Sequence, residues 1–444
     1  MPTLEGIVFI PLALYFFFES PGLLFPLLVF SAVFQASSII SSGPVGLQPY
    51  YCVAILFIFR HLVMGKKMNS GIPKKPYVRL WVAFLCISVL SAMVLPIAFS
   101  GILVFDPRYS TYENIIGPSP LQFRLGNAIQ AVFLLINVLV LITASRTPVS
   151  IPRAHKMFRI AAYTLVGCVV LQELTFRLGL AFPYWLVNNN PGYEVVGMSA
   201  INLRPPGTFT EPSMAGAVLA AFVAAFLWQY FAGRSGIARA GIAAAACLLV
   251  ASSSSLFAVL VMFGWLALTN SPFRFPWFIR LKKLKRMAIF LVSGFVLLIL
   301  MALPAIRNVV LSQTLEKSGS DSAVVRVAAD VFALSLVSQT HGLGVGLGSN
   351  RPSSLAPALL SQVGIPGLAL FLCAAANTLW NLPLEHRWIS LAAAALLISM
   401  AIGLPDISFP FLWILFALAA QSKAALAVEV IRKPVLGNKV PSPG

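Results

Sequence analysis

Charge is scarce in this chain, and negative charge is scarcest. Charged residues make up 10% of the 444 residues, and 13 Asp and Glu stand against 31 Lys and Arg. Hydrophobic residues make up 59%, and the mean hydropathy is +0.89. A soluble fold of this length cannot bury so much apolar surface, so the composition predicts a polytopic membrane protein. The apolar runs are long and continuous, which indicates spanning helices rather than the alternating strands of a β-barrel.

Several chemistries lack the residues that they need. No GxxxxGK[ST] motif is present, which excludes a P-loop for ATP. No HExxH motif and no Cys/His cluster occurs, so no metal site is expected. The five cysteines all lie in apolar segments and are expected to be small core residues, neither disulfides nor metal ligands. The net charge of +18 indicates basic residues flanking membrane spans, not a nucleic acid partner.

Apolar segments of helical length recur along most of the chain. They predict an all-α membrane domain over residues 1–432, with about 12 transmembrane helices. The predicted helices cover residues 22–42, 47–64, 80–104, 121–144, 158–182, 212–232, 236–251, 254–270, 287–306, 354–378, 389–404 and 408–422. Residues 4–18 form a further apolar segment, and the sequence leaves open whether it spans. No basic signal-peptide stretch precedes it, so it is expected to stay in the mature protein.

Basic residues gather in short loops on one side of the predicted helices. Residues 60–79, 146–159, 233–239 and 274–286, with Arg387 and the C-terminal tail, hold most of the Lys and Arg. By the positive-inside rule this side is cytoplasmic, and residues 433–444 are predicted to form a disordered cytoplasmic tail. The outer loops are then residues 105–123, 183–211 and 307–353. The last loop contains a predicted amphipathic helix at the membrane interface, with an apolar face of Val324, Val327, Val331 and Leu334.

Two outer segments break this charge pattern. They are RPPGTFTEPSMAG, residues 204–216, and RVAADVFALSLVSQTHGLGVGLGSNR, residues 326–351. Arg204, Arg326 and Arg351 offer forked N–H donors that match phosphate oxygens, so an anionic ligand is expected. Glu211 opens a helix, where the dipole favours a carboxylate, and it is the first candidate for a general base. The alternative is a capped helix start with an arginine for a lipid headgroup.

The second segment ends in a glycine ladder. Backbone N–H groups of Gly344, Gly346 and Gly348 could form an anion-binding concavity for a diphosphate. The alternative is a flexible link between the interfacial helix and the next span. His341, just before the ladder, is either the second candidate base or a solvated loop residue.

Two polar features interrupt the predicted spans. Glu173 and Arg177 lie four residues apart and are predicted to form an intramembrane ion pair, either functional or simply self-neutralising. The serines at 252–255 are expected to satisfy broken backbone between two tilted helices, with substrate contact as the alternative.

In several of its motifs the sequence resembles the O-antigen polymerase and ligase superfamily (Wzy-like), and the exopolysaccharide repeat-unit polymerases are the most similar. These are Arg204, the run Gly207-Thr-Phe-Thr-Glu-Pro-Ser213, Arg326, the run His341-Gly-Leu-Gly-Val-Gly-Leu-Gly-Ser349, and Gly364-Ile-Pro-Gly367. The similarity extends over the whole topology. Such proteins join glycans carried on a lipid diphosphate at the outer face of the bacterial inner membrane, without metal, nucleotide or other cofactor. Ligases of the superfamily show a His-Asn pair after the glycine ladder, whereas residues 350–354 here contain no histidine.

The resemblance implies a metal-independent glycosyltransferase in the inner membrane, facing the periplasm. Its substrate would be a polyprenyl-diphosphate-linked oligosaccharide, and its pathway partners a chain-length regulator and a flippase. Arg204, Glu211, Arg326 and His341 would be catalytic, and Arg351 with the ladder glycines would bind the diphosphate. Three other functions stay open: a ligase that transfers finished glycan, a lipid-linked glycan flippase or transporter, and a non-enzymatic partner in an envelope assembly complex.

Overall fold

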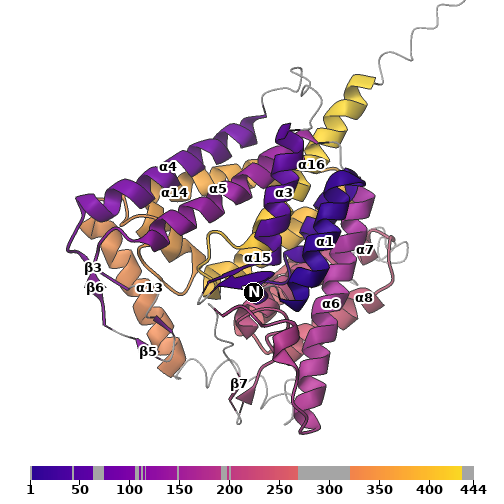
Figure 1. Ribbon diagram of the computed structural model, residues 1–444, viewed down its shortest axis with the longest axis horizontal. Coiled ribbons are helices and arrows are strands. Elements are labelled where there is room, and N and C mark those ends of the chain that lie inside the picture. Colours follow the sequence, from indigo (N-terminus) through magenta and orange to yellow (C-terminus); the bar gives the residue numbers. More distant parts are fainter. Residues whose placement is uncertain are drawn as a thin grey trace, which may run out of the picture.

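Helices dominate the protein. The structure is a computed structural model, and it describes residues 3–42, 45–63, 75–105, 110–111, 114–115, 117–147, 150–191, 198–199, 202–268 and 321–432. Within these residues the expected all-α class is observed, and the strands are short antiparallel pairs in the connections (Figure 1).

The helices follow the apolar runs of the sequence. They are α1 (Leu4–Phe18), α2 (Leu24–Ser31), α3 (Pro49–Val63), α4 (Pro76–Ala98), α5 (Leu125–Arg146), α6 (Ile151–Arg177), α7 (Pro212–Phe231), α8 (Ala238–Val250), α9 (Ser253–Leu268), α13 (Asp321–Gln339), α14 (Leu355–Leu379), α15 (Arg387–Gly403) and α16 (Pro410–Arg432). The described residues also form three short 3-10 turns, η1 (Pro21–Leu23), η2 (Tyr184–Leu186) and η3 (Leu384–His386). The strand pairs are β1 (Ile40–Ser42) with β2 (Val45–Leu47), β3 (Leu103–Val104) with β6 (Ser119–Pro120), β4 (Ser110–Thr111) with β5 (Asn114–Ile115), and β7 (Met198–Ser199) with β8 (Asn202–Leu203).

Six described helices are long and apolar enough to cross a membrane. They are α4, α5, α6, α7, α14 and the segment Leu384–Gly403, which contains α15. Helices α1, α3, α8 and α9, the segment Pro21–Ser31 and the stretch Pro410–Ala425 of α16 are apolar but shorter. The predicted helix 287–306 and the tail 433–444 lie outside the described residues.

One predicted helix is wrong over much of its length. Residues 22–42 were expected to be helical throughout, but α2 ends at Ser31 and the chain reaches strand β1 in extended turns. Distant contacts hold the residues after the break: the Ser38 backbone N–H donates to Asn189 Oδ1 at 2.7 Å, and Ser37 Oγ donates to the Val187 carbonyl at 2.7 Å. Helix 80–104 likewise ends early, at Ala98, before Gly101 with its positive φ of 93°.

The predicted interfacial helix is present as α13. Its apolar residues Val324, Val327, Val331 and Leu334 are 46–64% exposed, so they face away from the rest of the protein. The opposite side packs against α14 and against the β3–β6 pair, where Leu336 joins a small core of Val104, Leu121 and Val345 (Figure 1).

Helix α7 forms the centre of the bundle. Almost all of its residues are buried, and it packs against α8, α9 and α15. Small residues allow this close packing: a Cβ at Gly216 would overlap the Ser255 hydroxyl of α9. Helices α4, α5 and α14 lie on one side in Figure 1, and α6 and α8 on the other.

The two ends of the bundle differ in their polar contacts. At one end Lys75 Nζ, before α4, donates to the Ser145 carbonyl of α5, and Gln229 of α7 bonds to His155 of α6. Loops that the sequence groups as basic therefore share one end, here called the basic-loop end. The opposite end is here called the arginine end, and it is where α3, α5, α7, α9, α14 and α16 begin. At this end Tyr51 Oη, near the start of α3, donates to the Ser408 carbonyl before α16.

Candidate active site

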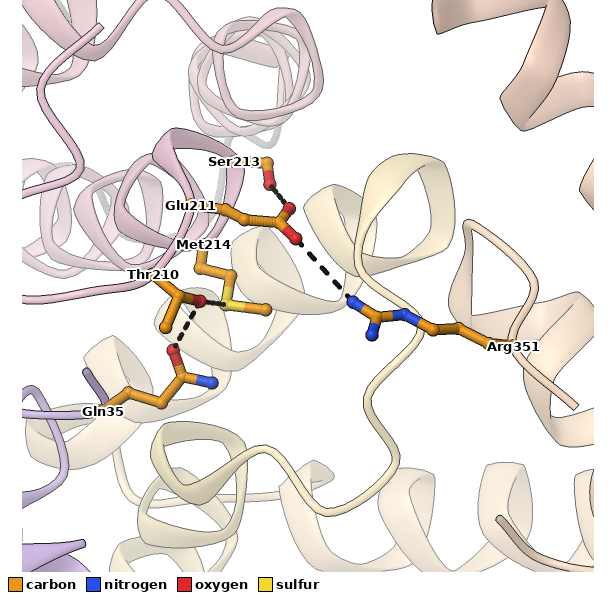
Figure 2. A network of polar contacts seen from close by, with 6 residues as sticks. All are labelled: Gln35, Thr210, Glu211, Ser213, Met214 and Arg351. Carbon is orange, nitrogen blue, oxygen red and sulfur yellow. Dashed lines mark hydrogen bonds and ion pairs between the residues drawn. The ribbon is translucent and has the colours of Figure 1, made fainter. Parts of the chain in front are cut away.

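Two predicted site segments that are distant in sequence meet at the arginine end. Glu211 is the N-cap residue of α7, with Pro212 as the first helical residue, as proline's fixed φ favours. Its Oε1 lies 3.8 Å from Arg351 Nη2, and its Oε2 accepts a hydrogen bond from Ser213 Oγ at 3.0 Å. Figure 2 shows the Arg351 side chain extending from the loop before α14 toward Glu211. The Glu211 side chain is 12% exposed, so this ion pair is partly shielded from solvent.

The loop before Glu211 is fixed to α6 and to the segment that follows α2. Gly207, with φ 62°, donates its N–H to Gln172 Oε1 at 2.7 Å and accepts at its carbonyl from Gln172 Nε2 at 2.8 Å. The positive φ favours glycine, and a Cβ at Gly207 would lie 2.5 Å from Leu165 Cδ1, so a side chain there would have to displace Leu165. The Thr208 hydroxyl donates to the Val33 carbonyl. These contacts fix the backbone that carries both Arg204 and Glu211.

Arg204 lies close to a second arginine. Its Nη2 donates at 2.8 Å to the carbonyl of Ala251, which has a left-handed φ of 49° at the break between α8 and α9. Its Nε is buried without a hydrogen-bond partner among the described residues. Burial, and then the charge of Arg326, lower the pKa of Arg204, while Glu211 acts in the opposite direction. Arg326 Nη1, from α13, lies 3.8 Å from the position of a Cβ at Gly403.

A fifth charged group, Asp406, was missed by the sequence interpretation. It lies between α15 and α16, and its Oδ1 accepts the backbone N–H of Ser408 at 2.8 Å. Burial raises its pKa to about 6, although the Ser408 hydrogen bond and the charge of Arg351 both lower it. The signal that could have found it is its place: it is one of only 13 acidic residues, and it lies between two predicted helices on the predicted outer side.

The charged groups form a continuous series, here called the arginine cluster: Arg326, Arg204, Glu211, Arg351 and Asp406. Neighbours in the series interact by charge, and the Glu211–Arg351 contact is an ion pair. The cluster contains three guanidinium groups and two carboxylates. Helices α7 and α14 begin beside it, so the positive ends of their dipoles are close to the cluster. The five side chains of the cluster therefore carry net positive charge where the sequence predicted an anionic ligand, and Asp330 on α13 places a further carboxylate next to the segment of Arg351.

Asp330 has a structural role, because it joins the two segments that carry Arg326 and Arg351. Its Oδ1 accepts the backbone N–H groups of Ser353 at 2.7 Å and Ser354 at 3.2 Å, and its Oδ2 accepts the Ser354 hydroxyl at 2.6 Å. Ser353 Oγ in turn donates to the Arg326 carbonyl at 3.2 Å. A carboxylate on α13 thus caps the start of α14, and it ties the segment of Arg326 to the segment of Arg351.

The glycine ladder does not offer free donors for a diphosphate. The backbone N–H of Gly344 donates to Thr340 Oγ1 at 3.0 Å, that of Gly346 to the Gln362 carbonyl at 2.9 Å, and that of Gly348 to Gln362 Oε1 at 2.9 Å. All three glycines have positive φ, and a Cβ on any of them would press on neighbouring atoms. The ladder is therefore not an anion concavity, and hydrogen bonds to α14 also make it more than a loose link.

His341 lies apart from the arginine cluster. It is exposed just beyond the C-terminal end of α13, with φ 50°. Arg326 is near the other end of that helix, about 20 Å away at the rise of an α-helix. Among the described residues no hydrogen bond or ion pair joins the His341 side chain to the cluster.

The other predicted features form locally. Glu173 Oε1 and Arg177 Nε are 2.6 Å apart in the last turn of α6, and the Arg177 side chain is 71% exposed. At the break between α8 and α9, Ser255 Oγ donates to the Ser252 carbonyl at 2.9 Å, and the Ser252 and Ser254 hydroxyls are 3.1 Å apart. The Ser252 carbonyl also accepts the Leu256 N–H at 3.0 Å, and the Ala251 carbonyl at the break is bonded by Arg204, so the serines themselves do not satisfy the broken backbone.

Comparisons with known proteins give no family for the chain. A scan against protein-family models finds no match, and a search of curated proteins finds no sequence with significant similarity. Within the described residues no group of three or more His, Cys, Asp or Glu side chains could hold a metal ion. Function must therefore be argued from the arginine cluster and its surroundings.

Proposed function

We propose that this protein is a membrane glycosyltransferase that polymerises glycan repeat units carried on a polyprenyl diphosphate. The arginine cluster is the observation that supports the proposal. Arg204 and Arg326 raise each other's energy because like charges repel, and Arg204 is also partly desolvated. Such an arrangement is costly without an anion and becomes favourable when a diphosphate lies between the guanidinium groups.

The chemistry would be stabilisation of the leaving group. As the bond between the sugar and the diphosphate breaks, negative charge grows on the diphosphate oxygens. Fixed guanidinium groups and the starts of α7 and α14 would stabilise that charge without having to reorganise. The apolar helices around the site would hold the polyprenyl chain, and the resemblance to Wzy-like polymerases supplies the glycan part of the proposal.

The test is a gel of lipid-linked glycans from cells that lack the protein and carry plasmid-borne variants. Arg326→Ala should reach the membrane at a normal level but polymerise about 10²–10³-fold more slowly, leaving single repeat units on the outer face. Arg326→Lys retains the charge and loses the fork, and should fall in between. Arg177→Ala is the matched control, because it removes an exposed arginine from a local pair, and it should give the full ladder.

The outcomes separate the alternatives. Long glycan chains in cells that carry the Arg326→Ala variant would contradict the proposal. Full-length chains stranded on the carrier in cells without the protein would indicate a ligase. Single units trapped on the cytoplasmic face would indicate a flippase or transporter.

A further inference from the structure

A second polar site adjoins the arginine cluster and is not used by leaving-group stabilisation. It is a small pocket, partly open to solvent, at the arginine end. Its lining residues come from the segment after α2, from α3, from α5 and from the α15–α16 connection: Gln35, Gln48, Tyr51, Gln130, Phe133, Asp406, Ser408 and Pro410. Here they are called the amide pocket.

Polar atoms of the amide pocket are available to a ligand. Ser408 is 3% exposed, and its Oγ is buried without a hydrogen-bond partner among the described residues. Asp406 uses Oδ1 for the Ser408 backbone, and no described residue donates to its Oδ2. Gln130 forms no hydrogen bond with the described residues through its amide. Leaving a buried polar group unpaired costs about 1–3 kcal/mol, so these groups are suited to a hydroxyl-rich occupant.

The apolar part of the pocket fits the same occupant. Tyr51 and Phe133 are stacked at 4.3 Å between ring centroids and form one wall. A sugar presents hydroxyl groups at its edge and C–H groups on its faces, so it matches amides beside aromatic rings.

Two contacts join the amide pocket to the arginine cluster. Gln35 Oε1 accepts the Thr210 hydroxyl at 3.5 Å, one residue before Glu211, as Figure 2 shows. Asp406, in the pocket wall, also interacts electrostatically with Arg351. A sugar in the pocket would therefore lie beside a diphosphate held by the arginines.

We propose that the amide pocket binds the terminal monosaccharide of the acceptor glycan and that Asp406 takes the proton from its attacking hydroxyl. This inference rests on the proposed function. The hydroxyl oxygen bonds to the anomeric carbon of the donor sugar, and the bond from that carbon to the diphosphate oxygen breaks. The electron pair leaves with the diphosphate, and the hydroxyl proton moves to Asp406 Oδ2.

Asp406 is better placed for this step than Glu211. Both oxygens of Glu211 are engaged, one by Arg351 and one by the Ser213 hydroxyl. Burial raises the pKa of Asp406 to about 6, close to the pH at which a general base works well. Among the described groups that face Asp406, Arg351 is the charged one and the Tyr51 phenol is the other titratable one. The carboxylate loses its function as it is protonated, so activity should fall as the pH drops through about 6.

The first test uses the purified full-length protein in detergent, with lipid-linked repeat units extracted from cells that lack the protein. Asp406→Asn keeps an oxygen for the Ser408 N–H, so the thermal stability should not fall. Its kcat should drop about 10²–10⁴-fold, and the remaining activity should lose the fall near pH 6. Glu385→Gln, an exposed carboxylate at the basic-loop end, is the matched control and should keep the wild-type rate and pH profile.

The second test separates the sugar from the diphosphate. Gln130→Ala should weaken binding of the repeat-unit oligosaccharide, freed of its lipid diphosphate, by about tenfold and leave binding of polyprenyl diphosphate unchanged. Arg326→Ala should show the reverse pattern.

If Asp406→Asn keeps the wild-type rate and pH profile while Arg326→Ala is inactive, the proposed function stands and the role of Asp406 is wrong. Normal oligosaccharide binding by Gln130→Ala would overturn the amide pocket as the acceptor site. If every variant polymerises normally, both proposals fall.

Discussion

The capping of α14 by Asp330 should be essential to the stability of the site. Asp330→Ala removes one carboxylate that accepts from the Ser353 N–H, the Ser354 N–H and the Ser354 hydroxyl. Loss of an N-cap costs about 0.5–2 kcal/mol, and a buried donor left unpaired costs about 1–3 kcal/mol. Because Ser353 and Ser354 are 1% and 4% exposed, water cannot easily replace the carboxylate. We expect a loss of about 2–4 kcal/mol, since the three bonds share one acceptor and are not additive.

Unfolding by SDS in dodecyl maltoside micelles, followed by tryptophan fluorescence, measures this loss. Ser354→Ala removes only one of the three bonds and should cost about 1 kcal/mol. Glu385→Ala removes a carboxylate whose contact with Arg234 is exposed, at 3.9 Å, and should cost less than about 1 kcal/mol. An unchanged unfolding midpoint for Asp330→Ala would refute the reasoning, because the start of α14 would then not depend on α13.

Two further predictions use the same unfolding assay. Gly364→Ala should cost more than about 2 kcal/mol, because φ is 73° and a Cβ would lie 2.5 Å from the Leu343 carbonyl oxygen; Gly233→Ala, with φ 69° but open space around it, should cost about 1 kcal/mol. Similar costs for the two variants would contradict the close contact at Gly364. A double-mutant cycle on Glu173 and Arg177 should give a coupling of about 0.3–0.5 kcal/mol, since Arg177 is mostly exposed; a coupling well above about 1 kcal/mol would indicate a desolvated pair.

Local apolar runs predict the helices well where Pro or Gly bounds them. The segment 212–232 is observed as α7 (Pro212–Phe231), and 236–251 as α8 (Ala238–Val250). Residues 22–42 fail for a nonlocal reason. Their apolar run reaches only Phe34, and in the polar stretch that follows Ser37 and Ser38 bond to a loop about 150 residues further along the chain. No pattern within the segment signals that contact.

The residues of the candidate site likewise fall into those that a local pattern predicts and those that depend on distant contacts. Arg204, Glu211 and Arg351 were found because charge on an expected outer loop is locally unusual. Asp406 was missed because its importance lies in its neighbours, which fold onto it from α3, α5 and the loop before α14. The ladder glycines were misjudged because a glycine pattern alone does not distinguish N–H groups that point to a ligand from those that bond to an adjacent helix.

The order of charges in the cluster gives the site its direction. Arg204 and Arg326 lie at one end of the series, where two like charges are neighbours. Glu211 and Asp406 flank Arg351 at the other end, and Asp406 opens into the amide pocket. An anion is therefore stabilised most at the end away from the pocket, and a proton is accepted most readily beside the pocket. A reaction in which a diphosphate leaves at one end and a hydroxyl attacks at the other uses both ends. An arginine pair for a lipid headgroup alone would require neither Asp406 nor the unpaired hydroxyl of Ser408.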